Sequence, residues 1–261
     1  MKTIPITNPY GAPVYSMERT PSTMDEARSL AARGVLSGTV IMADMQEAGR
    51  GRIPGRTWTS AAGESLLCTA ILRYATFRDI PAALSLRAGL AAARTIELVA
   101  PELEGRVRVK WPNDVLVVSE DGVGKKVCGI LCESDGAAVY IGSGFNLLQE
   151  AFPAGIAGKA SSIRLETGRR IDRTAVLETY LGELRRILDP SADAAWREEL
   201  EARLYRRGQR VEFEPGLADS GRSVFGVLEG IGPGGELLIR PDGEVPLVSF
   251  PTGELRVYAR N

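Results

Sequence analysis

Hydrophobic and polar positions along this chain fall into blocks that predict a mixed α+β fold. Several apolar runs have the length of strands and are bounded by turn residues. They are residues 38–45, 65–74, 106–118 (two strands broken by Pro112), 126–133 and 137–147. Between them, residues 79–100 are rich in alanine and leucine and end at Pro101, which is typical of a helix buried against a sheet.

A short amphipathic helix is predicted over residues 25–33. Ser22 and Thr23 each stand three residues before an acidic residue, as in a capping box, and Gly34 is a natural helix stop. The free N–H groups at the start of such a helix would suit a polar ligand. From spacing alone, a plain capping role for both residues is favoured.

Two helices and then a series of short strands are predicted in the C-terminal part of the chain. Helices are expected over 173–188 and 193–205. Beyond Gly208, five short strand runs follow one another within about 55 residues, which is typical of a small β-barrel of the SH3 kind. We therefore predict a mixed-sheet domain at 1–207 and a small barrel domain at 208–261.

Composition excludes several classes of function. The 261 residues are 44% hydrophobic and 25% charged, and the net charge of −1 gives no basic field of the kind that nucleic-acid binders carry. No run approaches the roughly 20 apolar residues of a membrane span, and the first residues form no signal-peptide core. Because the chain has no histidine, Cys/His zinc sites and histidine catalysis are excluded. Its three cysteines lie in strand runs and are expected to be reduced, in a cytoplasmic protein.

The most unusual stretch is Gln46–Trp58, which reads QEAGRGRIPGRTW. Its three glycines predict a loop that is mobile when empty, and Arg50, Arg52 and Arg56 supply planar forks that bind carboxylate or phosphate oxygens in pairs. The glycine spacing fits neither a dinucleotide fingerprint nor a P-loop. We expect the loop to close over an anionic ligand, although an isolated GRGR is more often an exposed basic hairpin.

Other polar residues gather at strand ends. Lys110, Asn113 and Asp114 put a cation, an amide and a carboxylate at one strand break, which a polar turn would explain equally well. Lys126 opens the next strand run, which should pair with the strand that carries Asp114. Residues 142–144, Gly-Ser-Gly inside a strand run, indicate close approach of a ligand or of another backbone.

Five motifs, in this order across residues 20–205, closely resemble those of the biotin–protein ligases. They are Ser22-Thr23, Q-x-A-G-R-G-R…G-R-x-W at Gln46–Trp58, KWPND at Lys110–Asp114, KVCGIL-x-E at Lys126–Glu133, and G-x-G-x-N at Gly142–Asn146. The resemblance implies the mixed-sheet catalytic fold of biotin and lipoate ligases, with packed helices and a small SH3-like barrel after it. It also implies a reaction of biotin with ATP to biotinyl-5′-AMP. The biotinyl group would then pass to a lysine of a carboxylase's biotin carboxyl carrier protein domain.

The same resemblance implies roles for individual residues. Lys126, Arg50 and Asp114 would be catalytic, with Lys126 as the central cation. Biotin would contact Ser22, Thr23, Met24, Gln46, Arg50, Gly51, Arg52 and Lys126. ATP would contact Arg52, Arg56, Trp58 (stacked on adenine), Lys110, Asn113 and Asn146. Asp114 would help to hold Mg²⁺ or would orient the lysine amine, and the sequence leaves both roles open.

Two departures from the family pattern bear on affinity. Met24 stands where the family usually has asparagine, so one hydrogen bond to the ureido group of biotin, worth about 1 kcal/mol, would be lost. The arginine loop has one extra residue, Ile53 or Pro54, which affects the position of Arg56. No helix-turn-helix domain precedes Thr20, so we expect a ligase without repressor function, and a homodimer is possible.

Two rival functions fit parts of the pattern. A lipoate or octanoate transferase or ligase would share the fold and also modify a carrier lysine, although its motifs match less well. A non-enzymatic protein could use the arginine loop to bind anions or nucleic acid, and its binding would then fall steeply with salt and ignore biotin.

Overall fold

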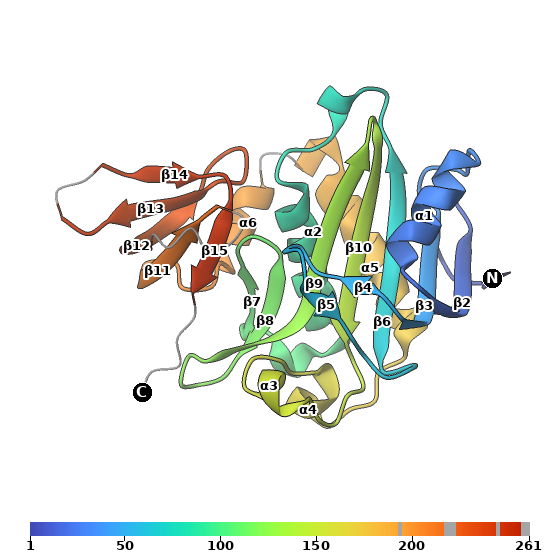
Figure 1. Cartoon of the computed structure of the whole chain (residues 1–261), viewed down its shortest axis with the longest axis horizontal. Helices are drawn as coiled ribbons and strands as arrows, with labels where there is room; N and C mark the ends of the chain where they lie inside the picture. The colour runs from blue at the N-terminus through green and yellow to red at the C-terminus, as the bar shows by residue number, and fades with distance from the viewer. Residues whose placement is uncertain (193–194, 217–222, 244–245, 257–261) are drawn as a thin grey trace.

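The structure is a computed structural model that describes residues 1–192, 195–216, 223–243 and 246–256 (Figure 1). Its main feature is an eight-stranded mixed sheet with strand order β1-β2-β3-β6-β10-β9-β8-β7. The strands are β1 (Lys2–Thr3), β2 (Val14–Thr20), β3 (Val40–Gln46), β6 (Ser65–Arg73), β7 (Val107–Lys110), β8 (Asp114–Val118), β9 (Gly124–Asp135) and β10 (Ala138–Asn146). Neighbouring strands are antiparallel except for β2 and β3, which are parallel and joined through α1 (Thr23–Ala32). Every strand run predicted for this sheet is confirmed.

Layers on both faces explain why several strands read as continuous apolar runs. Helices α2 (Leu84–Val99) and α5 (Arg173–Leu188) cover one face (Figure 1). Helix α1 and the short hairpin of β4 (Gly49–Arg50) and β5 (Thr57–Trp58) cover part of the other (Figure 1). Strand β6 is therefore buried over its whole length except at Arg73. A strand buried on both faces has no reason to alternate apolar and polar residues.

Helix α1 begins two residues before the predicted range of 25–33, directly after the predicted capping residue Ser22. Ser22 is its N-cap, with extended backbone, and its hydroxyl accepts the N–H of Met24 at 3.3 Å. Gly34 has a positive φ of 78° just beyond the last helical residues, as a helix stop requires. Thr23 does not cap, because its hydroxyl donates to the side chain of Gln46 instead.

Two other predicted helices are shorter than expected. The helix predicted from residue 79 starts at Leu84, because Pro81 holds Ile80 in extended backbone after a 3₁₀ turn at Phe77–Asp79. The helix predicted over 193–205 is α6 (Trp196–Ala202), and positions 193–194 lie outside the described residues. Its predicted last turn is wrong: residues 203–205 run beside β7 and exchange backbone hydrogen bonds with Val109.

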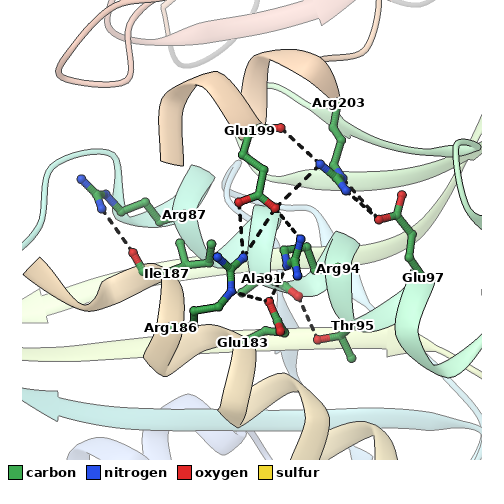
Figure 2. Close-up of polar contacts among 10 residues, drawn as sticks. All are labelled: Arg87, Ala91, Arg94, Thr95, Glu97, Glu183, Arg186, Ile187, Glu199 and Arg203. Carbon is green, nitrogen blue, oxygen red and sulfur yellow. Dashed lines mark hydrogen bonds and ion pairs between the residues drawn. The ribbon is translucent and has the colours of Figure 1, made fainter. Parts of the chain in front are cut away.

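A network of ion pairs joins α2, α5 and α6 (Figure 2). Arg94 on α2 donates to Glu183 on α5 and to Glu199 on α6, each at 2.6 Å. Arg203, just after α6, pairs with Glu97 on α2 at 2.9 Å. The network fixes α6, the last helix before the C-terminal strands, against the helical layer.

The C-terminal strands form a separate antiparallel sheet of order β14-β13-β12-β11-β15. They are β11 (Arg210–Pro215), β12 (Val224–Ile231), β13 (Leu237–Pro241), β14 (Val248–Phe250) and β15 (Gly253–Arg256). Only residues 251–252 separate the two edge strands, so the sheet must curl strongly. Within the described residues β14 and β15 are not paired, and the SH3-like barrel stays a prediction, as does the domain division at 207.

The curled sheet packs against the end of the main sheet that carries β7 and β8 (Figure 1). The indole N–H of Trp111, between these strands, donates to the carbonyl of Gly235 at 2.9 Å. The Trp111 ring also meets Phe213 edge to face, with centroids 5.8 Å apart. These contacts place β15 beside the turn that links β7 to β8. Among the described helices, none has both the length and the apolarity that a membrane crossing needs.

Candidate active site

A cavity of about 180 Å³ lies between α1, the arginine loop, the β7–β8 turn and the C-terminal sheet. This volume is below the roughly 300–1,000 Å³ of most ligand pockets, and residues of the arginine loop line the cavity. Every site residue predicted from the sequence lines it, with the exception of Asn146. The segments that carry the motifs therefore meet in one place.

Glycines on two neighbouring strands form the floor of the cavity. A Cβ at Gly144 in β10 would lie 2.7 Å from the indole of Trp58, and one at Gly129 in β9 would lie 2.8 Å from it. A Cβ at Gly142 would lie 2.8 Å from the terminal methyl of Met24. The indole N–H of Trp58 is buried and has no hydrogen-bond partner among the described residues, so it is available to an acceptor. Stacking of this ring on adenine stays a prediction.

A chain of hydrogen bonds makes one end of the cavity polar. Thr69 donates to Thr23, whose hydroxyl donates to Gln46, each at 2.9 Å. The same Gln46 oxygen also accepts the backbone N–H of Thr23 at 2.8 Å. Sequence reasoning missed Thr69 because it lies inside an apolar run. Its register opposite Gly142 on the floor is set only by the sheet.

The arginine loop forms a small hairpin of β4 (Gly49–Arg50) and β5 (Thr57–Trp58). Arg50 makes a bidentate ion pair with Asp25 on α1, at 2.9 and 2.6 Å. The hydrogen bonds from Arg50 lower the pKa of the Asp25 carboxyl. The predicted mobility of the empty loop stays a prediction, but its position over the cavity is that expected of a closing loop.

The C-terminal sheet supplies one wall of the cavity. Arg52 donates to the carbonyl of Gly253 at 2.9 Å, and Arg56 makes a bidentate ion pair with Glu254 at 2.9 and 2.8 Å. Burial acts to raise the pKa of Glu254, but the hydrogen bond and charge of Arg56 outweigh it and leave the pKa lowered. Sequence reasoning missed Glu254 because no local pattern connects it with a loop about 200 residues earlier.

A β-bulge directs Lys126 into the cavity. Strand β8 pairs Val115 with Cys128 and then Leu116 with Lys126, so Val127 is the extra residue. The bulge puts Lys126 on the floor side, next to Gly129, where plain alternation would not. Its Nζ lies 2.6 Å from Asp114 Oδ1 and 5.3 Å from the Trp58 ring centroid. The predicted pairing of these two strands is confirmed.

Lys110 is the cation with the fewest partners in the site. It ends β7 directly opposite Asp114 and is partly buried, and burial lowers the pKa of its ammonium group. Within the described part of the chain it makes no hydrogen bond or ion pair, although Asp114 and Glu254 are near enough to favour its charge. A partly buried cation with no hydrogen bond or ion pair in the described residues is well suited to receive an anion.

The two asparagines differ in position. Asn113 lines the cavity, and its amide donates to the carbonyl of Ile130 at 2.8 Å. Asn146 lies behind the lining and donates to the carbonyls of Lys126 at 3.3 Å and Ser161 at 3.1 Å. Its direct contact with ATP therefore stays a prediction, whereas the geometry gives it a role in holding the backbone of Lys126.

The charges of the cavity favour an anionic ligand. Five cationic side chains and two carboxylates line it, namely Arg50, Arg52, Arg56, Lys110, Lys126, Asp114 and Glu254. In the described residues no three acidic or cysteine side chains cluster as a metal site. The predicted help of Asp114 in holding Mg²⁺ stays a prediction. One or two carboxylates beside phosphate oxygens are the usual protein ligands of Mg²⁺.

Comparison with known proteins agrees with the motifs. Residues 16–146 match the model of the biotin/lipoate A/B protein ligase family. The bifunctional ligase/repressor BirA of Bacillus spizizenii is 36% identical over 171 residues, which are 61% of this chain and 49% of BirA, so the chain spans about half the length of that relative. The biotin–[acetyl-CoA-carboxylase] ligase of Paracoccus denitrificans is 34% identical over 235 residues, 86% of this chain and 92% of that protein.

Solved structures give the same result. Biotin protein ligase from Aquifex aeolicus in complex with biotin and ATP superposes with a TM-score of 0.74 at 26% identity, over 93% of this chain and 97% of that one. Fold, motifs and relatives together show that this chain belongs to the biotin/lipoate A/B protein ligase family.

Proposed function

We propose that this protein is a biotin–protein ligase that activates biotin with ATP and transfers the biotinyl group to a lysine of a carboxylase's carrier domain. The observation that carries the proposal is the convergence of Arg50, Lys110, Lys126 and Asp114 around one cavity with a glycine floor. The family, the Paracoccus ligase and the Aquifex complex with biotin and ATP support it.

In the first step a carboxylate oxygen of biotin attacks the α-phosphorus of ATP. The bond to the β-phosphate oxygen breaks, pyrophosphate leaves, and biotinyl-5′-AMP forms. Two anions must approach each other, so fixed cations that neutralise the crowded charge give the largest available stabilisation. Lys126 and Lys110 stand on hydrogen-bonded strands and need no reorganisation, and Arg50 needs only to leave Asp25.

In the second step the amine of the acceptor lysine attacks the acyl carbon. AMP leaves and the amine loses a proton, which gives the amide. Asp114 Oδ1 is held 2.6 Å from Lys126 Nζ, so its carboxylate has a fixed position from which to orient an incoming amine or to help hold Mg²⁺ that ATP brings. The loop above it would keep water from the mixed anhydride.

The polar end of the cavity suits the ureido ring, and the glycine floor suits the apolar acyl chain. Thr23 and Gln46 would pair with the ureido group, with Ser22 and the backbone of Gly51 nearby. Met24 contributes only a methyl contact to this end, so we expect weaker biotin binding, by about 1 kcal/mol, than asparagine would give. A cytoplasmic location, a carboxylase carrier partner, a possible homodimer and the lack of nucleic-acid binding belong to the same proposal.

The test is transfer of biotin to an acceptor. The protein is incubated with Mg-ATP, a biotin carboxyl carrier domain and either biotin or lipoate, and the mass of the acceptor is measured. We expect the biotinyl mass gain only. Lys126→Ala should lower the rate about 100-fold or more, whereas Lys125→Ala, one residue earlier on the same strand and outside the cavity lining, should keep it. Equal rates for the two variants would remove Lys126 from the mechanism, and transfer of lipoate alone would favour the rival function.

A further inference from the structure

The arginine loop is attached to the C-terminal sheet at two neighbouring residues of β15. Arg52 reaches the carbonyl of Gly253, and Arg56 reaches both oxygens of Glu254. The arginine side chains of the loop make one other set of hydrogen bonds with the described residues, those of Arg50 with Asp25. The loop is thus held from a part of the chain about 200 residues away in sequence.

The start of β15 is itself rigidly placed. Gly253 has a φ of 155°, and a Cβ there would lie 2.1 Å from the ring of Phe213, so only glycine fits. Its pairing with Pro215 in β11 fixes it in the sheet. Phe213 packs against Trp111, which is anchored to Gly235. The groups that accept hydrogen bonds from Arg52 and Arg56 are therefore held in place by the packing between the two sheets.

We propose that Gly253 and Glu254 form a catch that holds the arginine loop over the cavity, with Glu254 as a positioning residue that acts through Arg56. Only the purpose of the catch rests on the proposed function. That purpose is to retain biotinyl-AMP until the acceptor lysine arrives. The bidentate pair is partly exposed, with the Arg56 side chain at 60%, so it is weak enough to open for substrate entry.

Limited trypsin digestion of the ligand-free protein tests the catch without any activity assay. Trypsin takes the arginine guanidinium into its own specificity pocket, so cleavage after Arg56 requires that Arg56 first leave Glu254. Glu254→Gln should therefore speed cleavage after Arg56 by about two- to five-fold, the range expected for an exposed ion pair. Glu229→Gln removes a comparable exposed pair with Arg240 from the same sheet and should leave the rate unchanged.

A charge exchange separates the catch from a loss of fold. Arg56→Glu alone places two carboxylates side by side and should speed cleavage after Arg52, which stays a trypsin site when Arg56 is replaced. In Arg56→Glu/Glu254→Arg the pair can form with reversed charges, and cleavage after Arg52 should return toward the wild-type rate. Cleavage that is unaffected by Glu254→Gln, or raised equally by Glu229→Gln, or not restored by the exchange, would overturn the proposal.

A second readout connects the catch with the reaction. With biotin and Mg-ATP but no acceptor, a loosened loop should release biotinyl-AMP to solution, where water hydrolyses the mixed anhydride to biotin and AMP. AMP formation by Glu254→Gln should therefore exceed that of the wild type by a similar two- to five-fold factor. If Glu254→Gln is cleaved faster after Arg56 but neither it nor the wild type forms biotinyl-AMP, the catch is supported and the proposed function is wrong. Faster cleavage with no added AMP release from an active enzyme would defeat the retention role.

Discussion

Gly144→Ala should weaken ligand binding while the fold is kept. Gly144 lies in β10, hydrogen bonded to β6 on one side and to β9 on the other. Its new Cβ would lie 2.7 Å from Cε2 of Trp58, whereas carbon atoms in contact normally stay about 3.5–4.0 Å apart. A strand that is paired on both sides has little freedom to shift, so the indole at the end of the arginine loop must move by about 1 Å.

The size of the effect on binding depends on whether the free protein or the complex bears the cost of the added methyl group. Overpacking typically costs about 1–3 kcal/mol, and Trp58 on its loop can relieve most of it in the free protein. When a ligand occupies the floor the methyl group is still there, so the penalty falls on the complex. We therefore expect the dissociation constant for biotin to rise about 5- to 150-fold.

Calorimetric titration with biotin, alone and with ATP, measures this change, and a cooperative thermal melt checks the fold. Gly182→Ala on α5 is the matched control, because nothing lies within 4 Å of its added Cβ. A helical glycine replaced by alanine should stabilise the protein by about 0.5–1 kcal/mol and leave binding unchanged. If Gly144→Ala bound biotin as the wild type does, the glycine floor would not be the ligand site.

Two further predictions concern charged groups. Burial lowers the pKa of the Lys110 ammonium group below the ordinary lysine value of about 10.4. The KM for ATP should therefore rise as the pH increases through this folded-state pKa, because the cation is lost. Lys110→Arg should make the KM for ATP less dependent on pH, because arginine keeps its charge. Between the folded and unfolded pKa values the unfolded chain binds more protons, so the ligand-free protein should gain stability as pH rises through that window, and thermal melts check this sign. Glu199→Gln should cost about 1–2 kcal/mol in urea unfolding, because it weakens the partly buried pair with Arg94, whereas Glu47→Gln at the exposed Arg19 pair should cost less than about 0.5 kcal/mol. Burial acts to raise the pKa of Glu199, but Arg94 and Arg186 leave it lowered. The stability lost in Glu199→Gln should therefore shrink as the pH falls through the folded-state pKa of Glu199. Equal losses of stability for Glu199→Gln and Glu47→Gln would contradict the reasoning.

Local signals were sufficient where one short segment determines its own structure. The helix predicted over 173–188 has those bounds, because Asp172 accepts the N–H groups of Thr174 and Ala175 at its start. The start predicted at residue 79 was wrong for an equally local reason, the proline at 81. The prediction gave the alanine-rich pattern more weight than this proline. The predicted end at 205 failed because pairing with Val109 in β7 overrides helix propensity, and no local pattern reports that partner.

The site divides in the same way. Motifs identified the loop arginines, Lys110, Asp114 and Lys126 because their residue types and spacing already state a chemistry. They did not show that Lys126 needs a bulge to face the cavity, since that depends on the register with β8. Thr69 and Glu254 belong to the site only through strand pairing and the docking of the second sheet, which no short pattern encodes.

What holds each cation indicates what each can do. Lys110 and Lys126 stand on paired strands, so their charges are fixed before a substrate arrives, as stabilisation of a transition state requires. The loop arginines depend on ion pairs and hydrogen bonds with Asp25, Gly253 and Glu254, and exposed pairs of this kind are worth about 0–1 kcal/mol each. Groups held so weakly can exchange an internal carboxylate for a ligand anion at little cost. The strand cations should therefore govern the rate of the chemical step, and the loop arginines should govern how substrates enter and how long the intermediate stays.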